Sequence, residues 1–230
     1  MPIINKKPEP AGILSSGQKK ILEAFFDLRQ SDFFCLSGGN ALSEFYLGHR
    51  KSFDLDFITG REDLILEFSR NLEKKFAEFC SIRVPRRFET FAEVEAGLEK
   101  EKVKIHLAYE SPFRFSEPVK IKNLIVNNYL DLITDKFLAF YGRAEARDAV
   151  DLYFILTEEK IDFWELSEYA KKKDQGYDLY WMAAWLEKAQ KLPDQLERWP
   201  VEMIKALEVK ALKELFRKIA DEILEKITKK

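Results

Sequence analysis

The stretch FFCLSGGNALSEFYLGHRKSFDLD, residues 33–56, contains the features that decide the fold of this chain. A short apolar run leads through a Ser-Gly-Gly turn into a helical segment, and two aspartates one residue apart close the stretch. Asp54 and Asp56 lie in residues 53–58, which we predict to be a β-strand, and side-chain alternation then places both carboxylates on one face. Two carboxylates on one face can share a divalent metal.

The Ser-Gly-Gly turn and the helix after it form a pattern that suits phosphate binding. Glycine lets the backbone approach an anion closely, and the start of a helix offers unpaired N–H groups and the positive end of its dipole. We therefore expect Ser37, Gly38, Gly39 and Asn40 to contact a triphosphate, which Asp54 and Asp56 would hold against Mg²⁺. For Ser37 and Asn40 the alternative is that their side chains only cap the helix.

The composition predicts a globular protein without a dominant charge. Of the 230 residues, 46% are hydrophobic, which is ample for a buried core. The 38 basic and 40 acidic residues nearly cancel, so any contact with RNA must come from a local patch. Arg83, Arg86 and Arg87 form the best such patch, although a run of this kind is usually an ordinary solvated strand edge.

The two cysteines and the apolar runs predict a cytoplasmic protein with no membrane segment. Cys35 and Cys80 are too few for a disulfide scaffold. The N-terminus lacks the apolar core of a signal peptide, and no apolar run reaches the ~18 residues of a membrane span.

Hydrophobic periodicity predicts a mixed first part and a helical second part. We expect a helix near residues 21–28 before the first strand, and a helix at 62–79 after the aspartate strand. Further strands are expected at 81–84, 88–94 and 102–108, and helices from 128 onward. The expected domains are residues 1–127 and residues 128–230, and the helical lobe would pack on the core and complete a cleft.

The order of these motifs resembles the DNA polymerase beta type nucleotidyltransferase superfamily, and within it the AbiEii toxin family. The matching residues are Gly38, Gly39, Asn40, Gly48, His49, Arg50, Ser52, Asp54 and Asp56. A second block, LITDKFLAFYGRAEARDAVDLYFIL at residues 132–156, supplies Lys136, Arg143, Arg147, Asp148, Asp151 and Leu152 in the family's order. The resemblance implies an α+β fold, in which a nucleotidyltransferase mixed-sheet core is followed by a C-terminal helical lobe.

The resemblance also implies roles for charged residues of both blocks. Arg50 and Ser52 would join the nucleotide-binding residues. Lys136 and Arg143 fall on one helical face and would bind the triphosphate, although a solvated lysine is the ordinary alternative. Asp148 is expected in the active site and Asp151 in a structural role, where the i, i+4 spacing would allow it to pair with Arg147.

One position departs from the family pattern. The superfamily has a third carboxylate on a later strand, and here that position is His106, in the run VKIHLAYESPF. A histidine there can act as a base or a weak metal ligand. The alternatives are impaired catalysis or a histidine that only packs.

The resulting hypothesis is a magnesium-dependent nucleotidyltransferase that moves a nucleoside monophosphate from an NTP to an acceptor. The resemblance implies tRNA or another RNA as acceptor, a toxin role in an AbiE-like system, and an antitoxin or regulator as partner. One alternative is the nucleotidylation of a small molecule such as an aminoglycoside. Another is a non-catalytic module that binds NTP or a partner and has lost the third carboxylate.

Overall fold

The computed structural model describes residues 6–99, 101–159 and 161–229 of the chain. The chain forms two compact units, Met1–Leu132 and Ile133–Lys230. The first unit contains strands and helices, and the second contains helices only among its described residues. This is the α+β class predicted from the sequence. The prediction that the second unit completes a cleft stays a prediction.

In the described part of the first unit, seven strands form one mixed sheet in the order β3-β4-β5-β2-β1-β7-β6. Strand β2 is central, because it pairs antiparallel with β1 and parallel with β5. The strands are β1 (Cys35–Ser37), β2 (Asp54–Thr59), β3 (Ser81–Arg87), β4 (Phe91–Gly97), β5 (Lys102–Tyr109), β6 (Val119–Ile121) and β7 (Leu124–Val126). The β6–β7 hairpin was not predicted, since its strands are only three residues long.

The helices of the first unit begin near the predicted positions. They are α1 (Ser16–Phe26), α2 (Gly38–Leu42), α3 (Ile65–Phe76) and the start of α4 (Tyr129–Arg143). Helix α1 starts with a capping box between Ser15 and Gln18. Helix α2 begins directly after β1 and continues as one π-helical segment, η2 (Ser43–Leu47).

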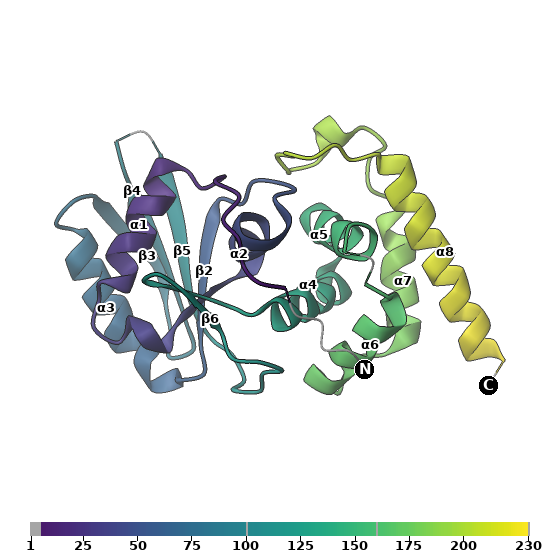
Figure 1. Cartoon of the computed structure of the whole chain (residues 1–230), viewed down its shortest axis with the longest axis horizontal. Coiled ribbons are helices and arrows are strands. Elements are labelled where there is room, and N and C mark those ends of the chain that lie inside the picture. Colours follow the sequence, from purple (N-terminus) through teal and green to yellow (C-terminus); the bar gives the residue numbers. More distant parts are fainter. Residues whose placement is uncertain (1–5, 100, 160, 230) are drawn as a thin grey trace. The chain divides into compact units, whose positions relative to one another are not determined.

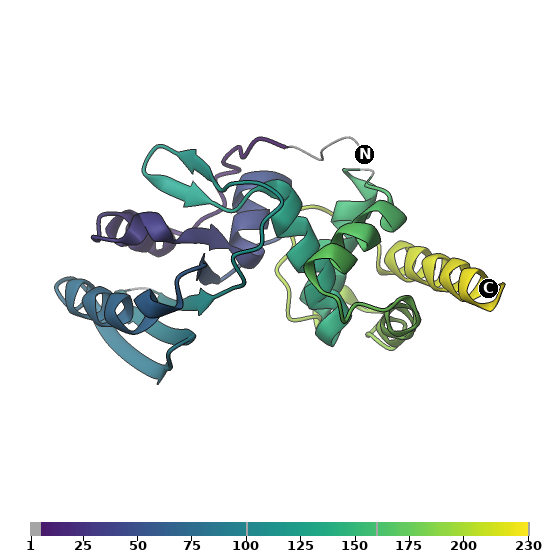
Figure 2. The same cartoon turned by 90° about the horizontal axis from the view of Figure 1, so that it is seen from below.

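Helices α1 and α3 cover one face of the sheet (Figures 1 and 2). The ring of Phe25 in α1 stacks on Phe57 of β2 with centroids 3.6 Å apart and planes 6° apart. Phe68 of α3 packs against Phe25 as well. These rings are fully buried. The helix-covered face therefore takes every second side chain of the central strands, and Asp54 and Asp56 belong to the opposite face.

The N-terminal arm, which we define as residues 6–15, is held by a buried glutamate. The carboxylate of Glu44 accepts the backbone N–H groups of Gly12, Ile13 and Leu14 at 3.0, 2.8 and 3.1 Å. Because a charged acceptor makes the stronger kind of hydrogen bond, this arm is tied to η2.

The second unit is built from the rest of α4 and from α5 (Ala146–Thr157), α6 (Phe163–Lys173), α7 (Leu179–Ala189) and α8 (Val209–Thr228). Its core includes Phe140 of α4, whose ring meets Phe216 of α8 edge to face at 5.3 Å. Among the described residues of both units, no helix is long and apolar enough to cross a membrane.

The Phe25–Phe57 stack predicts a large loss of stability for Phe25→Ala. The truncation leaves a cavity between α1 and the sheet, and it should lower the free energy of unfolding by about 3–5 kcal/mol. Denaturant unfolding monitored by circular dichroism measures this loss. Phe88→Ala is the matched control, because Phe88 is 57% exposed, and an equal loss in both variants would contradict the packing described.

Candidate functional site

The two aspartates of β2 lie on the sheet face opposite α1 and α3. Leu55 and Phe57 are completely buried under those helices. Asp54 and Asp56 alternate with them and are half-buried, with 32% of the Asp56 side chain exposed. The predicted placement of both carboxylates on one face thus follows from the burial pattern of the strand.

A row of paired residues crosses five strands and passes through Asp56. Its members, taken from β3 to β1, are Arg86, Glu93, His106, Asp56 and Ser37. Nε of Arg86 lies 3.4 Å from Oε2 of Glu93. Nδ1 of His106 donates to Oδ1 of Asp56 at 2.8 Å. The structure therefore places His106 directly against a predicted metal-binding carboxylate.

A second row reaches Asp54 in the same way. Arg83, Glu95, Lys104 and Asp54 are paired in register across β3, β4, β5 and β2. Arg83 and Glu95 form an ion pair at 3.4 Å. Charges of opposite sign thus alternate across this face, and each aspartate ends the charged part of its row.

The environment of His106 favours its charged form. The hydrogen bond that His106 donates to Asp56 raises the pKa of His106 above its usual value, and the charges of Asp56, Asp54 and Glu93 act in the same direction. Partial burial lowers the pKa but does not outweigh these effects. His106 thus occupies the position where the family pattern has a third carboxylate, but its surroundings favour a positive charge and not a negative one.

The turn at Gly38 brings the backbone against Asp56. Gly38 has a φ of +66°, a left-handed conformation that favours glycine. A Cβ atom on this residue would overlap the Asp56 carboxylate. Glycine is therefore required at this position for two separate reasons.

The next glycine brings Arg50 and Ser52 to the same turn. A Cβ atom on Gly39 would lie 2.7 Å from Nη2 of Arg50 and 2.8 Å from Oγ of Ser52. Arg50 is only 4% exposed. The nucleotide-binding residues predicted in the first unit are therefore neighbours of one turn.

Neither Ser37 nor Asn40 caps the helix. Ser37 is the residue before α2, but its side chain makes no capping hydrogen bond. Nδ2 of Asn40 donates to the backbone oxygen of Ser52 at 3.1 Å. Oδ1 of Asn40 is buried without a hydrogen-bond partner among the described residues. The capping alternative is wrong for both residues, and their contact with phosphate stays a prediction.

The predicted residues of the second unit form two ion pairs. Nζ of Lys136 lies 2.9 Å from Oδ2 of Asp151, and both side chains are buried. Arg143 binds both carboxylate oxygens of Asp148, at 2.6 and 2.8 Å. The nucleotide-binding role of Lys136 and Arg143 and the active-site role of Asp148 stay predictions.

One expectation about arginines is corrected by these contacts. Nε of Arg147 lies 3.0 Å from Oε2 of Glu145, so Arg147 pairs with Glu145, and Lys136 is the ion-pair partner found for Asp151. Each arginine of the expected basic patch also faces a glutamate. The pairs are Arg83 with Glu95, Arg86 with Glu93 and Arg87 with Glu73. These ion pairs reduce the net positive charge of that edge, and its contact with RNA stays a prediction.

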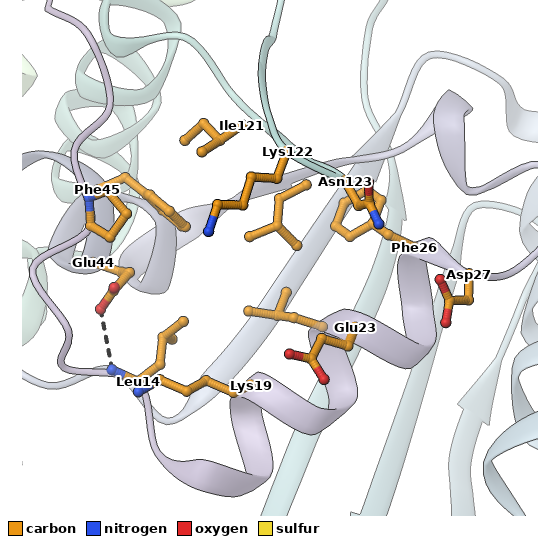
Figure 3. Close-up of a pocket in the computed structure, with 13 residues that line it drawn as sticks. Leu14, Lys19, Glu23, Phe26, Asp27, Glu44, Phe45, Ile121, Lys122 and Asn123 are labelled. Atoms are coloured by element: carbon orange, nitrogen blue, oxygen red, sulfur yellow. Dashed lines mark hydrogen bonds between the residues drawn. The ribbon is translucent and has the colours of Figure 1, made fainter.

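A pocket of about 710 Å³ in the first unit lies away from these residues (Figure 3). It is lined by Leu14 of the arm, by Leu22 and Phe26 of α1, and by Glu44 and Lys122, among others. No predicted site residue belongs to its described lining. The candidate site is therefore defined by the rows and the glycine turn.

The donor set of the site fits magnesium bound together with a nucleotide. Among the described residues, no three acidic, histidine or cysteine side chains gather as a metal site of their own. Magnesium in phosphoryl-transfer sites is commonly bound by one or two carboxylates together with substrate phosphates. Asp54 and Asp56 are the carboxylates that would serve here, and the Asp56 carboxylate lies directly beside the Gly38 backbone.

Comparisons with known proteins place this geometry in a family. The chain matches the family model "Nucleotidyl transferase AbiEii toxin, Type IV TA system" over residues 20–229. A curated relative is the uncharacterised protein aq_aa25 of Aquifex aeolicus, which is 28% identical over 176 residues, 72% of this chain and 78% of the relative.

Two solved structures share the fold. The structure of JHP933 from Helicobacter pylori has a TM-score of 0.58 at 18% identity and covers 92% of this chain and 90% of its own. MenT4, a nucleotidyltransferase toxin from Mycobacterium tuberculosis, has a TM-score of 0.57 at 14% identity, with 90% and 82% covered. The family match extends over most of the chain and includes both sequence blocks. The chain therefore belongs to the AbiEii family of nucleotidyltransferase toxins and is a nucleotidyltransferase.

Proposed function

We propose that this enzyme transfers a nucleoside monophosphate from an NTP to an RNA acceptor, in a magnesium-dependent reaction that makes it a toxin. The observation that carries the proposal is the contact between the Asp56 carboxylate and the Gly38 backbone. This contact supports the proposal because it joins the carboxylate that would hold the metal to the glycine turn that would bind the phosphates. Cys35 and Cys80 are free thiols, and this supports action in the reducing cytoplasm.

In the first unit, some residues would bind the metal and others would bind the phosphates. Asp54 and Asp56 would hold magnesium, which neutralises charge on the phosphates and orients the attacking and leaving oxygens. Ser37 and the backbone of Gly38 and Gly39 would hold phosphate oxygens. Arg50 lies beside Gly39 and would compensate negative charge there.

His106 would act on the carboxylate and not as a third metal ligand. Its Nδ1 hydrogen bond keeps the Asp56 carboxylate in one orientation. Nδ1 carries the proton of this hydrogen bond, so it has no lone pair left for a metal.

The acceptor is tested by following the transferred nucleotide. The protein is incubated with each α-labelled NTP, magnesium and total bacterial RNA, and the products are separated into RNA, protein and small molecules. Label in RNA supports the proposal, and its sensitivity to ribonuclease identifies the product. Label in an added aminoglycoside and not in RNA would instead support small-molecule nucleotidylation.

The metal assignment predicts that Asp54→Ala and Asp56→Ala each abolish the magnesium-dependent thermal shift caused by NTP. Neither side chain fills the core, so both variants should remain folded, although Asp56→Ala loses the hydrogen bond from His106 and should melt somewhat lower. Differential scanning fluorimetry measures both quantities. Asp63→Ala is the matched control, because Asp63 is an exposed carboxylate that pairs with Arg61. An undiminished shift in the β2 variants would reject the metal site.

The buried ion pair of the second unit separates two roles of Lys136. Lys136→Met leaves Asp151 buried with an uncompensated charge, so stability should fall by about 3–5 kcal/mol. Asp151→Asn in the same protein removes that charge and should restore most of the stability. If Lys136 binds phosphate, the double variant should still bind NTP weakly by calorimetric titration. Full recovery of affinity would show that the lysine only supports the fold.

The toxin role predicts that expression in a bacterial host slows growth and that Asp56→Ala relieves this effect. The reason is that toxicity should depend on nucleotidyl transfer. Growth curves after induction measure it, with Asp63→Ala as the control and immunoblots to confirm equal protein levels. Unrelieved toxicity in the Asp56→Ala strain would separate toxicity from catalysis.

A further inference from the structure

A chain of hydrogen bonds leads from outside the predicted motifs to the Ser37 hydroxyl. Asn127 follows β7 and is completely buried. Its Nδ2 donates to Oγ of Ser37 at 3.2 Å. Its Oδ1 accepts from Nη1 of Arg114 at 3.2 Å. Asn127 thus connects an arginine to a residue of the glycine turn.

The backbone of Asn127 is fixed on both sides. Its N–H donates to the backbone oxygen of Leu36 at 2.8 Å, which continues the pairing of β7 with β1. Its carbonyl oxygen accepts from the Tyr46 hydroxyl at 2.8 Å. Burial raises the pKa of Tyr46, so this hydroxyl keeps its proton and remains a donor. The Asn127 side chain therefore starts from a well-determined position.

The chemistry of arginine determines which way the Asn127 amide faces. A guanidinium group has only donors, so the atom that faces Arg114 must be the amide oxygen. The amide nitrogen then faces Ser37, and the Ser37 oxygen must accept. Because a hydroxyl has one hydrogen, that hydrogen is left to point away from Asn127.

The position of Ser37 would allow this hydrogen to form a hydrogen bond with a bound anion. Ser37 pairs in register with Asp56 on the same sheet face and directly precedes Gly38. Among the described residues, the structure gives its hydroxyl no hydrogen bond other than the one from Asn127. The hydroxyl is thus set up to donate to an anion at the glycine turn.

We propose that Asn127 is a positioning residue that makes the Ser37 hydroxyl a donor to a triphosphate oxygen. Arg114 supports it by fixing the orientation of the Asn127 amide. This inference rests on the proposed function, because it assumes that the triphosphate binds beside Ser37. The inference specifies that Ser37 donates the hydrogen bond and the triphosphate accepts it, which no motif of the sequence indicates.

The substitution Asn127→Asp tests the direction of the hydrogen bond. Aspartate has nearly the same shape and keeps an oxygen for Arg114, but its second oxygen would accept the Ser37 hydrogen. The affinity for the magnesium complex of the best-bound NTP should fall about tenfold or more, as expected for a lost hydrogen bond to a charged group. Calorimetric titration measures the dissociation constant, and thermal unfolding checks the fold.

A double-variant cycle separates this effect from simple repulsion by the new charge. Asn127→Asp should cause no further loss in a Ser37→Ala protein, because the hydroxyl is already absent. A further loss of similar size would overturn the proposal, as would unchanged affinity in the single variant. If Asn127→Asp unfolds the protein, Arg114→Met serves instead. It should weaken binding in the wild-type background and leave the Ser37→Ala protein unaffected.

Asp56→Ala, measured beside these variants, distinguishes a failure of the proposed function from a failure of the role of Asn127. Retained magnesium-dependent affinity in Asp56→Ala would reject the proposed function itself. Loss of affinity in Asp56→Ala together with normal affinity in Asn127→Asp would reject only the role of Asn127.

Discussion

The rest of the first unit depends on one constraint, which is that the side chains of β2 alternate between the core and the open face of the sheet. One set of its side chains must fill the core under α1 and α3, while the alternate set presents two carboxylates to the other face. Leu55 and Phe57 are completely buried, so the register of the strand cannot shift by one residue without burying the aspartates. The core and the site are therefore fixed by the same alternation.

The strands next to β2 supply the other residues of the candidate site. Strand β1 ends opposite Asp56 and passes straight into α2 through Gly38, whose conformation lets the backbone contact the carboxylate. Strand β5 places His106 against the same carboxylate from the other side. The site residues of the first unit thus come from segments up to 70 residues apart, yet each contact follows from strand pairing. Glu93, which pairs with His106, joins the row in the same way.

The features that could be predicted best from the sequence are those formed by residues close together in the chain. The aspartate strand, the glycine turn and the helices around them follow from local alternation and periodicity, and the family motifs lie in these segments. The rows across the sheet could not be predicted, because pairing among β3, β4 and β5 is set by tertiary structure and not by local pattern. Glu93 was missed for this reason, and so was the compensation of Arg83 and Arg86. Asn127 lies outside the predicted motifs, and the capping contact at the start of α4 belongs to its neighbour Asn128, which accepts the N–H of Asp131.

The alternation of charge across the open face offers a physical account of the change from carboxylate to histidine. A third carboxylate at position 106 would face Asp56 on one side and Glu93 on the other, and like charges paired directly across strands are destabilising. His106 with a raised pKa instead continues the alternation that runs from Arg86 to Asp56. Under the proposed function, the two carboxylates of β2 would bind the metal, and the substrate phosphates would supply the other anionic ligands.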